Sequence, residues 1–185
     1  MPLLLVAIAG AFAWEFPVTV PLLTSVTFGG DATAYGWALA SLAAGSVAGG
    51  LLTARARDVG TRAVALAAVG WGVTLLAVAA APTLAVAYAL FALVGVGAVA
   101  FNAISKTVLQ VRSADRMRGR VMALWSTGWQ GTTVIGAPVV GFVGEWVGPR
   151  AALGVGGVTT LLAGGTALLL SARRRRRAGR ASGPP

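Results

Sequence analysis

The segment Asp115-Arg-Met-Arg-Gly-Arg-Val-Met-Ala-Leu124 is the most polar interior stretch of an otherwise apolar chain. One apolar run, residues 83–104, precedes it, and another, residues 121–143, follows it. Each run is long enough to cross a lipid bilayer, because a spanning helix needs about 20 predominantly apolar residues. Short loops rich in Lys and Arg stay on the cytoplasmic side of a membrane. This segment therefore predicts how the whole chain is oriented.

Composition also indicates a membrane protein. Hydrophobic residues make up 57% of the 185 residues and charged residues only 11%, whereas soluble domains carry about 25% charged residues. The chain has no Cys and no His, which excludes disulfides and the usual zinc sites. Its net charge of +10 could indicate nucleic-acid binding. The basic residues, however, form short clusters between apolar runs, as topology signals do, and this argues against nucleic acid as a partner.

Six apolar runs predict an all-α fold, an integral membrane bundle of six transmembrane helices within residues 1–171. The expected spans are about 2–23, 35–54, 63–81, 83–104, 121–143 and 151–170, and residues 172–185 form a basic tail that we expect to be disordered. If the N-terminus is cytoplasmic, every Lys and Arg except Arg150 falls on the cytoplasmic side. The positive-inside rule therefore predicts a multi-pass protein of the plasma membrane with both termini in the cytoplasm.

Glu15 is the strongest candidate for a functional residue, because it interrupts the first apolar run between Trp14 and Phe16. A carboxylate at the centre of a spanning helix costs about 2.5–3.5 kcal/mol on insertion scales, so it must face the interior, be protonated or be paired. Pro17 and Pro21 predict a bent helix that lines a cavity. The functional interpretation is a proton-coupling carboxylate or a site for a cationic substrate. The structural interpretation is a hydrogen-bonded Glu, or one near the membrane interface.

Further polar side chains could join this site. Asn102 and Lys106 lie four residues apart on one face of the fourth predicted helix, and Gln130 lies in the fifth with Trp125 and Trp129 near it. A polar and aromatic lining suits a flat, apolar small molecule. Helix-end polarity beside a basic loop would explain Asn102 and Lys106 equally well, and an aromatic girdle at the membrane interface would explain Trp125. The predicted proton or substrate site consists of Glu15, Trp14, Asn102 and Gln130.

Asn102 and the segment from Gln110 to Leu124 resemble the loop between helices ten and eleven of exporters of the major facilitator superfamily. The resemblance is strongest to the drug and siderophore efflux branch, which includes macrolide and enterobactin exporters. The segment from Asp31 to Gly50 is similar to the start of helix eight in that branch. The resemblance implies the C-terminal half of such a transporter, helices seven to twelve, with a 3+3 inverted repeat. It also implies export of small molecules by an ion gradient, with protons as the expected antiported ion.

Two loops resemble cytoplasmic gating motifs of this superfamily. The segment from Gly50 to Arg62 is similar to the second copy of its loop motif, although the Asp expected four residues after the Gly is Ala54 here. Asp58 is expected to pair with Arg55 or Arg62, and such an exposed pair contributes only about 0–1 kcal/mol. The candidate gating residues are Gly50, Arg55, Asp58, Arg62, Asp115, Arg116, Arg118, Gly119 and Arg120.

Glycine is unusually frequent, with 26 residues, about twice the usual share of roughly 7%. Small residues in membrane helices let the helix backbones approach each other closely. The stretch from Gly131 to Gly141 faintly resembles the glycine-proline motif of antiporters. Within it, Pro138 is expected to bend its helix.

No nucleotide-binding loop, acid–base pair or nucleophile with its base is present, so we predict neither an enzyme nor a bound cofactor. Expected partners are the lipid bilayer, a small-molecule substrate and a second six-helix bundle, because a complete transporter of this type has two bundles with the substrate between them. The chain could be a truncated gene product, one half of a split transporter, or a half that dimerises. The alternative function is a non-transporting membrane scaffold or assembly subunit, which would have little reason to keep Glu15 buried.

Overall fold

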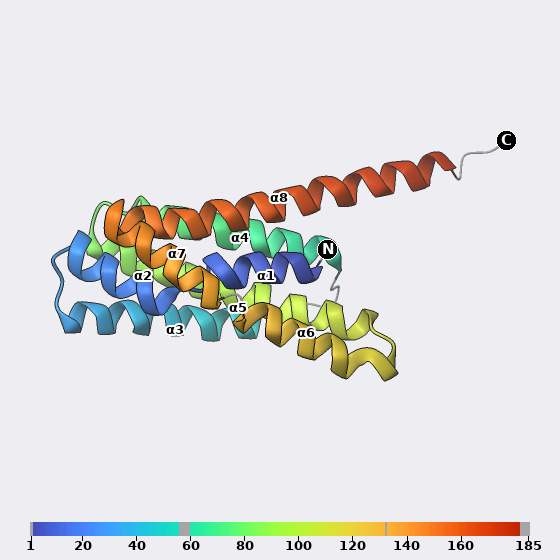
Figure 1. Ribbon diagram of the computed structural model, residues 1–185, viewed down its shortest axis with the longest axis horizontal. Coiled ribbons are helices and arrows are strands. Elements are labelled where there is room, and N and C mark those ends of the chain that lie inside the picture. Colours follow the sequence, from blue (N-terminus) through green and yellow to red (C-terminus); the bar gives the residue numbers. More distant parts are fainter. Residues whose placement is uncertain (1, 56–59, 132, 182–185) are drawn as a thin grey trace.

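The computed structural model describes residues 2–55, 60–131 and 133–181, and the side chains within these ranges from residue 5 to residue 172. Every regular element in this part of the chain is helical, which confirms the predicted all-α fold (Figure 1). The α-helices are α1 (Pro2–Phe12), α2 (Phe16–Leu22), α3 (Ala32–Ala54), α4 (Thr61–Ala79), α5 (Leu84–Arg112), α6 (Arg118–Gln130), α7 (Thr133–Trp146) and α8 (Pro149–Ala181). A π-helical turn at Leu23–Thr27 follows α2, and a 3-10 turn at Asp115–Met117 precedes α6.

Five helical segments are long and apolar enough to cross a membrane. They are Leu5–Thr27, Ala32–Ala54, Thr61–Ala79, Leu84–Arg112 and Pro149–Ala172. The remaining predicted span, residues 121–143, is divided between α6 and α7, which have 13 and 14 residues and are each too short to cross alone. Figure 1 shows α6 and α7 following one another along the bundle, so together they take the place of the sixth crossing.

The first span consists of two helices rather than one bent helix. α1 ends at Phe12 and α2 begins at Phe16, so residues 13–15 are not helical. Pro17 explains the break, because it lies in the first turn of α2. In a continuous helix its nitrogen would have no hydrogen to donate to the Ala13 carbonyl, and its ring would clash with that carbonyl.

The basic central segment is mostly helical instead of forming a long loop. α5 continues to Arg112 and α6 begins at Arg118, so only residues 113–117 connect them. α8 likewise continues to Ala181, although the sequence predicted disorder from residue 172 onward. Ala and Arg both have high helix propensity, which allows a helix to continue beyond its apolar run.

The closest helix crossing joins α3 to α5. Gly45 and Gly49 of α3 face the backbones of Ala92 and Val96 in α5, and Gly95 of α5 faces the backbone of α3 in return. A Cβ atom at Gly45 would lie only 2.6 Å from the carbonyl carbon of Ala92. Glycine is therefore required for this approach. α3 makes nearly all of its helix contacts with α5 and leaves its other faces exposed.

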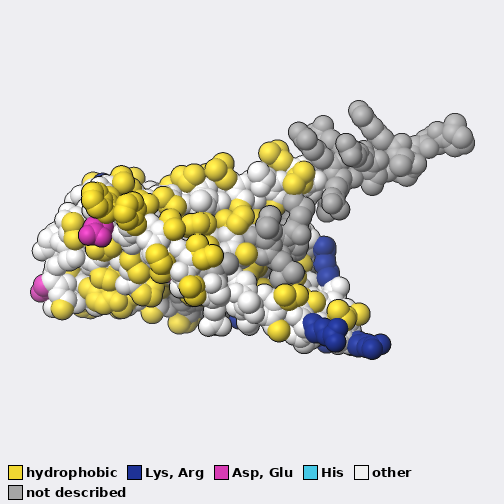
Figure 2. Space-filling model, viewed as in Figure 1, with side chains coloured by type: hydrophobic (Ala, Val, Ile, Leu, Met, Phe, Trp, Pro, Cys, Tyr) yellow, Lys and Arg dark blue, Asp and Glu magenta, His cyan; other side chains and the backbone are white. Residues whose placement is uncertain are grey.

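The two ends of the bundle differ in charge. At one end Arg112 donates a hydrogen bond to Thr61 Oγ1 at 2.6 Å, which brings the end of α5 next to the start of α4. At the opposite end Arg150 donates to the Ala81 carbonyl oxygen at 2.7 Å and lies over the ring of Phe28. Figure 2 shows Lys and Arg side chains toward one end of the visible face and Asp and Glu side chains toward the other. The end with Arg112 and the other Lys and Arg side chains is called the basic end below.

Candidate functional site

The break in the first span places a carboxyl group inside the bundle. Glu15 is only 3% exposed and immediately precedes α2. Its Oε1 atom has no hydrogen-bond partner among the residues that the structure describes, and the Thr133 side chain lies close to the same carboxyl group. A buried polar atom without a partner destabilises a structure by about 1–3 kcal/mol. Glu15 is therefore suited to bind a proton, or to accept a hydrogen bond from a bound molecule.

Six aromatic side chains, called the aromatic cluster below, pack together beside this break. They are Trp14, Phe16, Trp71, Phe101, Trp125 and Trp129. The ring centroid of Trp14 lies 4.9 Å from that of Trp129, 5.5 Å from that of Phe16 and 6.1 Å from that of Trp71. Trp71 in turn lies 5.6 Å from Phe101, and both are fully buried. The cluster thus joins α2, α4, α5 and α6 next to Glu15.

The end of α1, beside the break in the first span, also packs against α7 and α8. Gly136 of α7 packs against the carbonyl group of Ala11, and Gly156 of α8 packs against that of Phe12. These two carbonyls belong to the last turn of α1, where a helix has acceptors without partners inside the helix. Because glycine has no side chain, the neighbouring helices can approach them. Thr133 begins α7 and lies close to Glu15, so the break in the first span and the start of α7 lie together.

The structure brings together two of the four residues predicted for the site. Trp14 and Glu15 both lie at the break, and Asn102 is half-buried directly after Phe101 of the aromatic cluster. Gln130 is exposed, whereas its neighbour Trp129 is buried in the cluster. Successive residues of a helix point about 100° apart, so these two cannot face the interior together.

Lys106 holds a positive charge at the edge of the aromatic cluster. Its Nζ atom lies 4.2 Å from the ring centroid of Trp125. Trp125 is buried, and its ring stacks on that of Trp129 with 5.5 Å between their centroids. Trp125 is therefore packed inside the bundle and is not part of a lipid-facing aromatic girdle. A cation over a Trp ring contributes about 0.5–1 kcal/mol, and more when it is desolvated.

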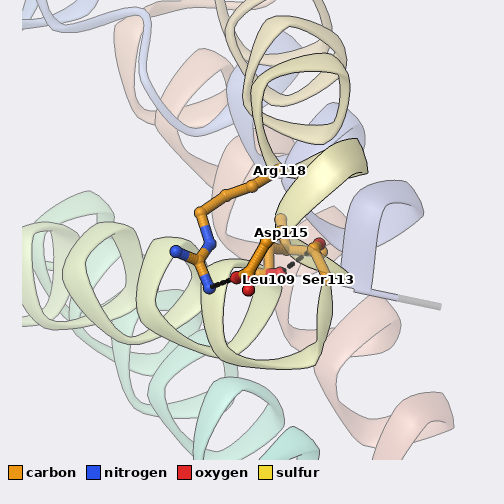
Figure 3. A network of polar contacts seen from close by, with 4 residues as sticks. All are labelled: Leu109, Ser113, Asp115 and Arg118. Atoms are coloured by element: carbon orange, nitrogen blue, oxygen red, sulfur yellow. Dashed lines mark hydrogen bonds and ion pairs between the residues drawn. The ribbon is translucent and has the colours of Figure 1, made fainter.

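The predicted gating loops lie at the basic end. Figure 3 shows the ion pair between Arg118 and Asp115 Oδ1, at 2.7 Å, and the Ser113 hydroxyl donating to the Leu109 carbonyl. Both members of the ion pair are more than half exposed, so it contributes about 0–1 kcal/mol. Asp58, expected to pair with a neighbouring arginine, lies outside the described residues. Gly50 is half-buried, and the other exposed members of the set are Arg55, Arg62, Arg116, Gly119 and Arg120.

Three residues of the site are not predicted by the sequence. Trp71 and Phe101 lie in apolar runs, where an aromatic residue gives no indication of which helix it faces. Trp71 is nevertheless the only aromatic residue within residues 63–81, between two glycines. A single large aromatic residue between two glycines was the sequence feature that could have indicated Trp71 as part of the site. Thr133 has no comparable signal, because a lone Thr in a spanning helix is common.

These features define a class of protein, a helical membrane bundle with interrupted spans and a carboxyl group at an interruption. Discontinuous spans that carry polar groups inside the membrane are typical of transporters. The chain belongs to the Major Facilitator Superfamily, whose sequence profile matches residues 3–185. No curated protein matches the chain. Members of this superfamily are transporters rather than enzymes, so the chain is a membrane transport protein.

Proposed function

We propose that the chain is the C-terminal half of a proton-driven exporter of small molecules such as drugs or siderophores, with Glu15 as the proton-carrying group. The observation that supports this most directly is the burial of Glu15 at a helix break, with Oε1 unpartnered within the described part of the chain. Ionisable groups inside a membrane are costly to keep, and in transport proteins they mark proton relays and substrate sites.

Protons and substrate compete for Glu15 in this mechanism. Binding of a proton neutralises the carboxylate and so reduces the free energy that its burial costs. A hydrogen-bond donor or a positive charge on the substrate has the same effect once the proton has left. Because either a proton or the substrate is sufficient to neutralise Glu15, a proton that binds from the outside of the cell displaces the substrate to that side. This exchange couples export to the proton gradient.

The aromatic cluster supports a flat and largely apolar substrate. Trp and Phe rings offer a large apolar contact area, and their faces attract cations. Trp14 links the ring cluster to Glu15 along the chain. The similarity of Asp115–Leu124 to efflux exporters supports the choice of drugs or siderophores within this class.

A second six-helix bundle completes the transport pathway in this proposal. α6 exposes Ser126, Thr127 and Gln130, and lipid tails cannot form hydrogen bonds with such side chains. We therefore place the second bundle, from another chain or a second copy, against α6 and the exposed faces of α3 and α7. The basic end and both termini lie on the cytoplasmic side of the plasma membrane in this proposal, because loops rich in Lys and Arg stay on that side.

Replacement of Glu15 tests the coupling role. Glu15→Gln keeps the shape of the side chain but fixes it in a neutral state. The chain is purified from native membranes with any bundle that accompanies it, reconstituted into liposomes and assayed with ethidium and with a macrolide, erythromycin. Gradient-driven export should fall about tenfold or more, while substrate exchange without a gradient persists. Glu15→Asp, which is one methylene shorter, should slow export without uncoupling it.

Glu145→Gln is the matched control, because Glu145 is exposed at the end of α7. This variant should export both probes at the wild-type rate. Export by Glu15→Gln at the wild-type rate and with the same pH dependence would refute the coupling role. A wild-type preparation that moves neither probe would favour the non-transporting scaffold. An active preparation that contains a single copy of this chain and no other bundle would contradict the proposed partner.

A further inference from the structure

A groove lies between α4 and α8 at the basic end of the bundle. Its lining consists of Arg62 and Leu66 from α4 and Leu168, Leu169, Ser171 and Ala172 from α8. The two helices pack along each other, and Figure 1 shows α8 continuing past the end of the bundle. The groove thus opens where the apolar parts of both helices end, with an apolar wall and one guanidinium group.

The charge around this groove is positive. Arg62 is exposed, and it forms no ion pair with any residue that the structure describes. Arg112 donates to Thr61 Oγ1 at 2.6 Å, so a second guanidinium group is held beside the residue next to Arg62. The sequence continues directly after the groove with an unbroken run of arginines, residues 173–177. The groove therefore favours an anionic group at its open end.

The apolar wall faces the lipid. Leu66 is 51% exposed and Leu169 is 65% exposed, and exposed apolar side chains such as Val73 and Leu162 continue along the same two helices. Exposed leucines are stable against lipid tails, since the tails are as apolar as leucine itself. A free anion would leave this wall uncovered. An occupant that matches both parts has an anionic headgroup and a hydrocarbon chain.

We propose that the groove binds one anionic phospholipid, with its phosphate at Arg62 and an acyl chain along Leu66, Leu168 and Leu169. In the orientation given above, this lipid belongs to the cytoplasmic leaflet. It bridges α4 and α8 where α8 leaves the bundle, and so holds the end of α8 against its neighbour. Basic pockets between membrane helices on the cytoplasmic side are known to select such headgroups. Binding at this groove does not depend on export, so its test and the test of Glu15 fail separately.

Native mass spectrometry of the purified protein measures this binding with two lipids that share the same acyl chains. Phosphatidylglycerol, which is anionic, should be retained in preference to phosphatidylcholine, which is zwitterionic. Arg62→Gln should weaken phosphatidylglycerol binding about fivefold, the contribution expected of one arginine near a membrane surface. Arg116→Gln removes the same charge from an exposed position at the same end, outside the groove, and should bind as the wild type does.

Leu66→Gln adds a test of the apolar wall and should weaken both lipids. Equal weakening by Arg62→Gln and Arg116→Gln would overturn the proposal, because it would show attraction to the general charge of this end. Equal retention of the two lipids by the wild type would also overturn it. So would displacement of the bound lipid by inorganic phosphate, which would show a headgroup site without an acyl-chain site. If Arg62→Gln does not elute as a monodisperse protein, Arg62→Lys keeps the charge and should retain the preference.

Discussion

Replacing Gly45 with Ala should separate α3 from α5 where the two helices cross. The added Cβ would lie 2.6 Å from the Ala92 carbonyl carbon and 2.8 Å from the Ala92 Cα, whereas ordinary contact begins at 3.4 Å. These are backbone atoms, so no side chain can rotate away. The Ala92 carbonyl oxygen would lie closer still, so the helices must move apart by about 1 Å or more, and a gap of about 0.5–1 Å already loses a quarter to a half of the dispersion energy of each contact. Overpacking of this kind costs about 1–3 kcal/mol.

Helix propensity acts in the opposite direction, because Ala is more favourable than Gly by about 0.8–1.0 kcal/mol in a helix interior. Gly36→Ala is the matched control, since it makes the same change in α3 at a position where a Cβ would have no atom within 4 Å. The difference between the two variants isolates the packing cost. At about 2–4 °C per kcal/mol for a chain of this size, Gly45→Ala should melt roughly 2–12 °C below Gly36→Ala.

Fluorescence-detected size-exclusion chromatography after heating measures both melting temperatures in the same detergent. The tagged chain is heated in steps, and the remaining monodisperse peak is plotted against temperature. Melting of the two variants within about 1 °C of each other would refute the reasoning, because a cost of 1 kcal/mol corresponds to at least twice that difference. α3 would then lie farther from α5 than the structure places it.

Two further predictions concern topology and the contact between α1 and α7. Reporter fusions should read extracytoplasmic after Gly29 and Gly148 and cytoplasmic after Gly60, Ser113 and Gly183. A cytoplasmic reading at either of the first two positions would exclude the six-crossing topology. Gly136→Ala should melt roughly 2–12 °C below Gly141→Ala, because a Cβ at Gly136 would lie 2.5 Å from the Ala11 carbonyl carbon, while one at Gly141 meets only a Val18 methyl group at 4.0 Å. Equal melting of these two variants would show that α7 does not pack on the end of α1.

The membrane fold could be predicted because apolar length and basic clusters are both visible in a sequence. The positions of the helix breaks could not. Pro17 and Pro138 predict bends equally well, yet the chain breaks before Pro17 and α7 continues through Pro138. Pro138 lies close to the start of α7, where removing one N–H affects only a short preceding stretch of helix. The interruption comes instead between α6 and α7, where no proline is present.

The candidate site could be predicted in part, and the limit has a physical cause. Glu15 stands out because a carboxyl group in an apolar run is costly to bury in a membrane, and Trp14 is its neighbour in the sequence. Trp71 and Phe101 do not stand out, because an apolar side chain is acceptable on any face of a membrane helix. The choice between Trp129 and Gln130 depends on the rotation of α6, and that rotation is fixed by packing between helices that are far apart in sequence.

α3 depends on a helix that is synthesised much later than itself. Its main partner, α5, is complete only about 60 residues after α3 ends, which takes a ribosome roughly 3–12 s at 5–20 residues per second. Throughout that interval the glycine face of α3, with Gly45 and Gly49, has no partner of its own. The nascent chain must keep this face from pairing with the wrong helix until α5 has left the translocation channel. Insertion of α3 into the bilayer and its docking in the bundle are therefore separate events in biogenesis, with seconds between them.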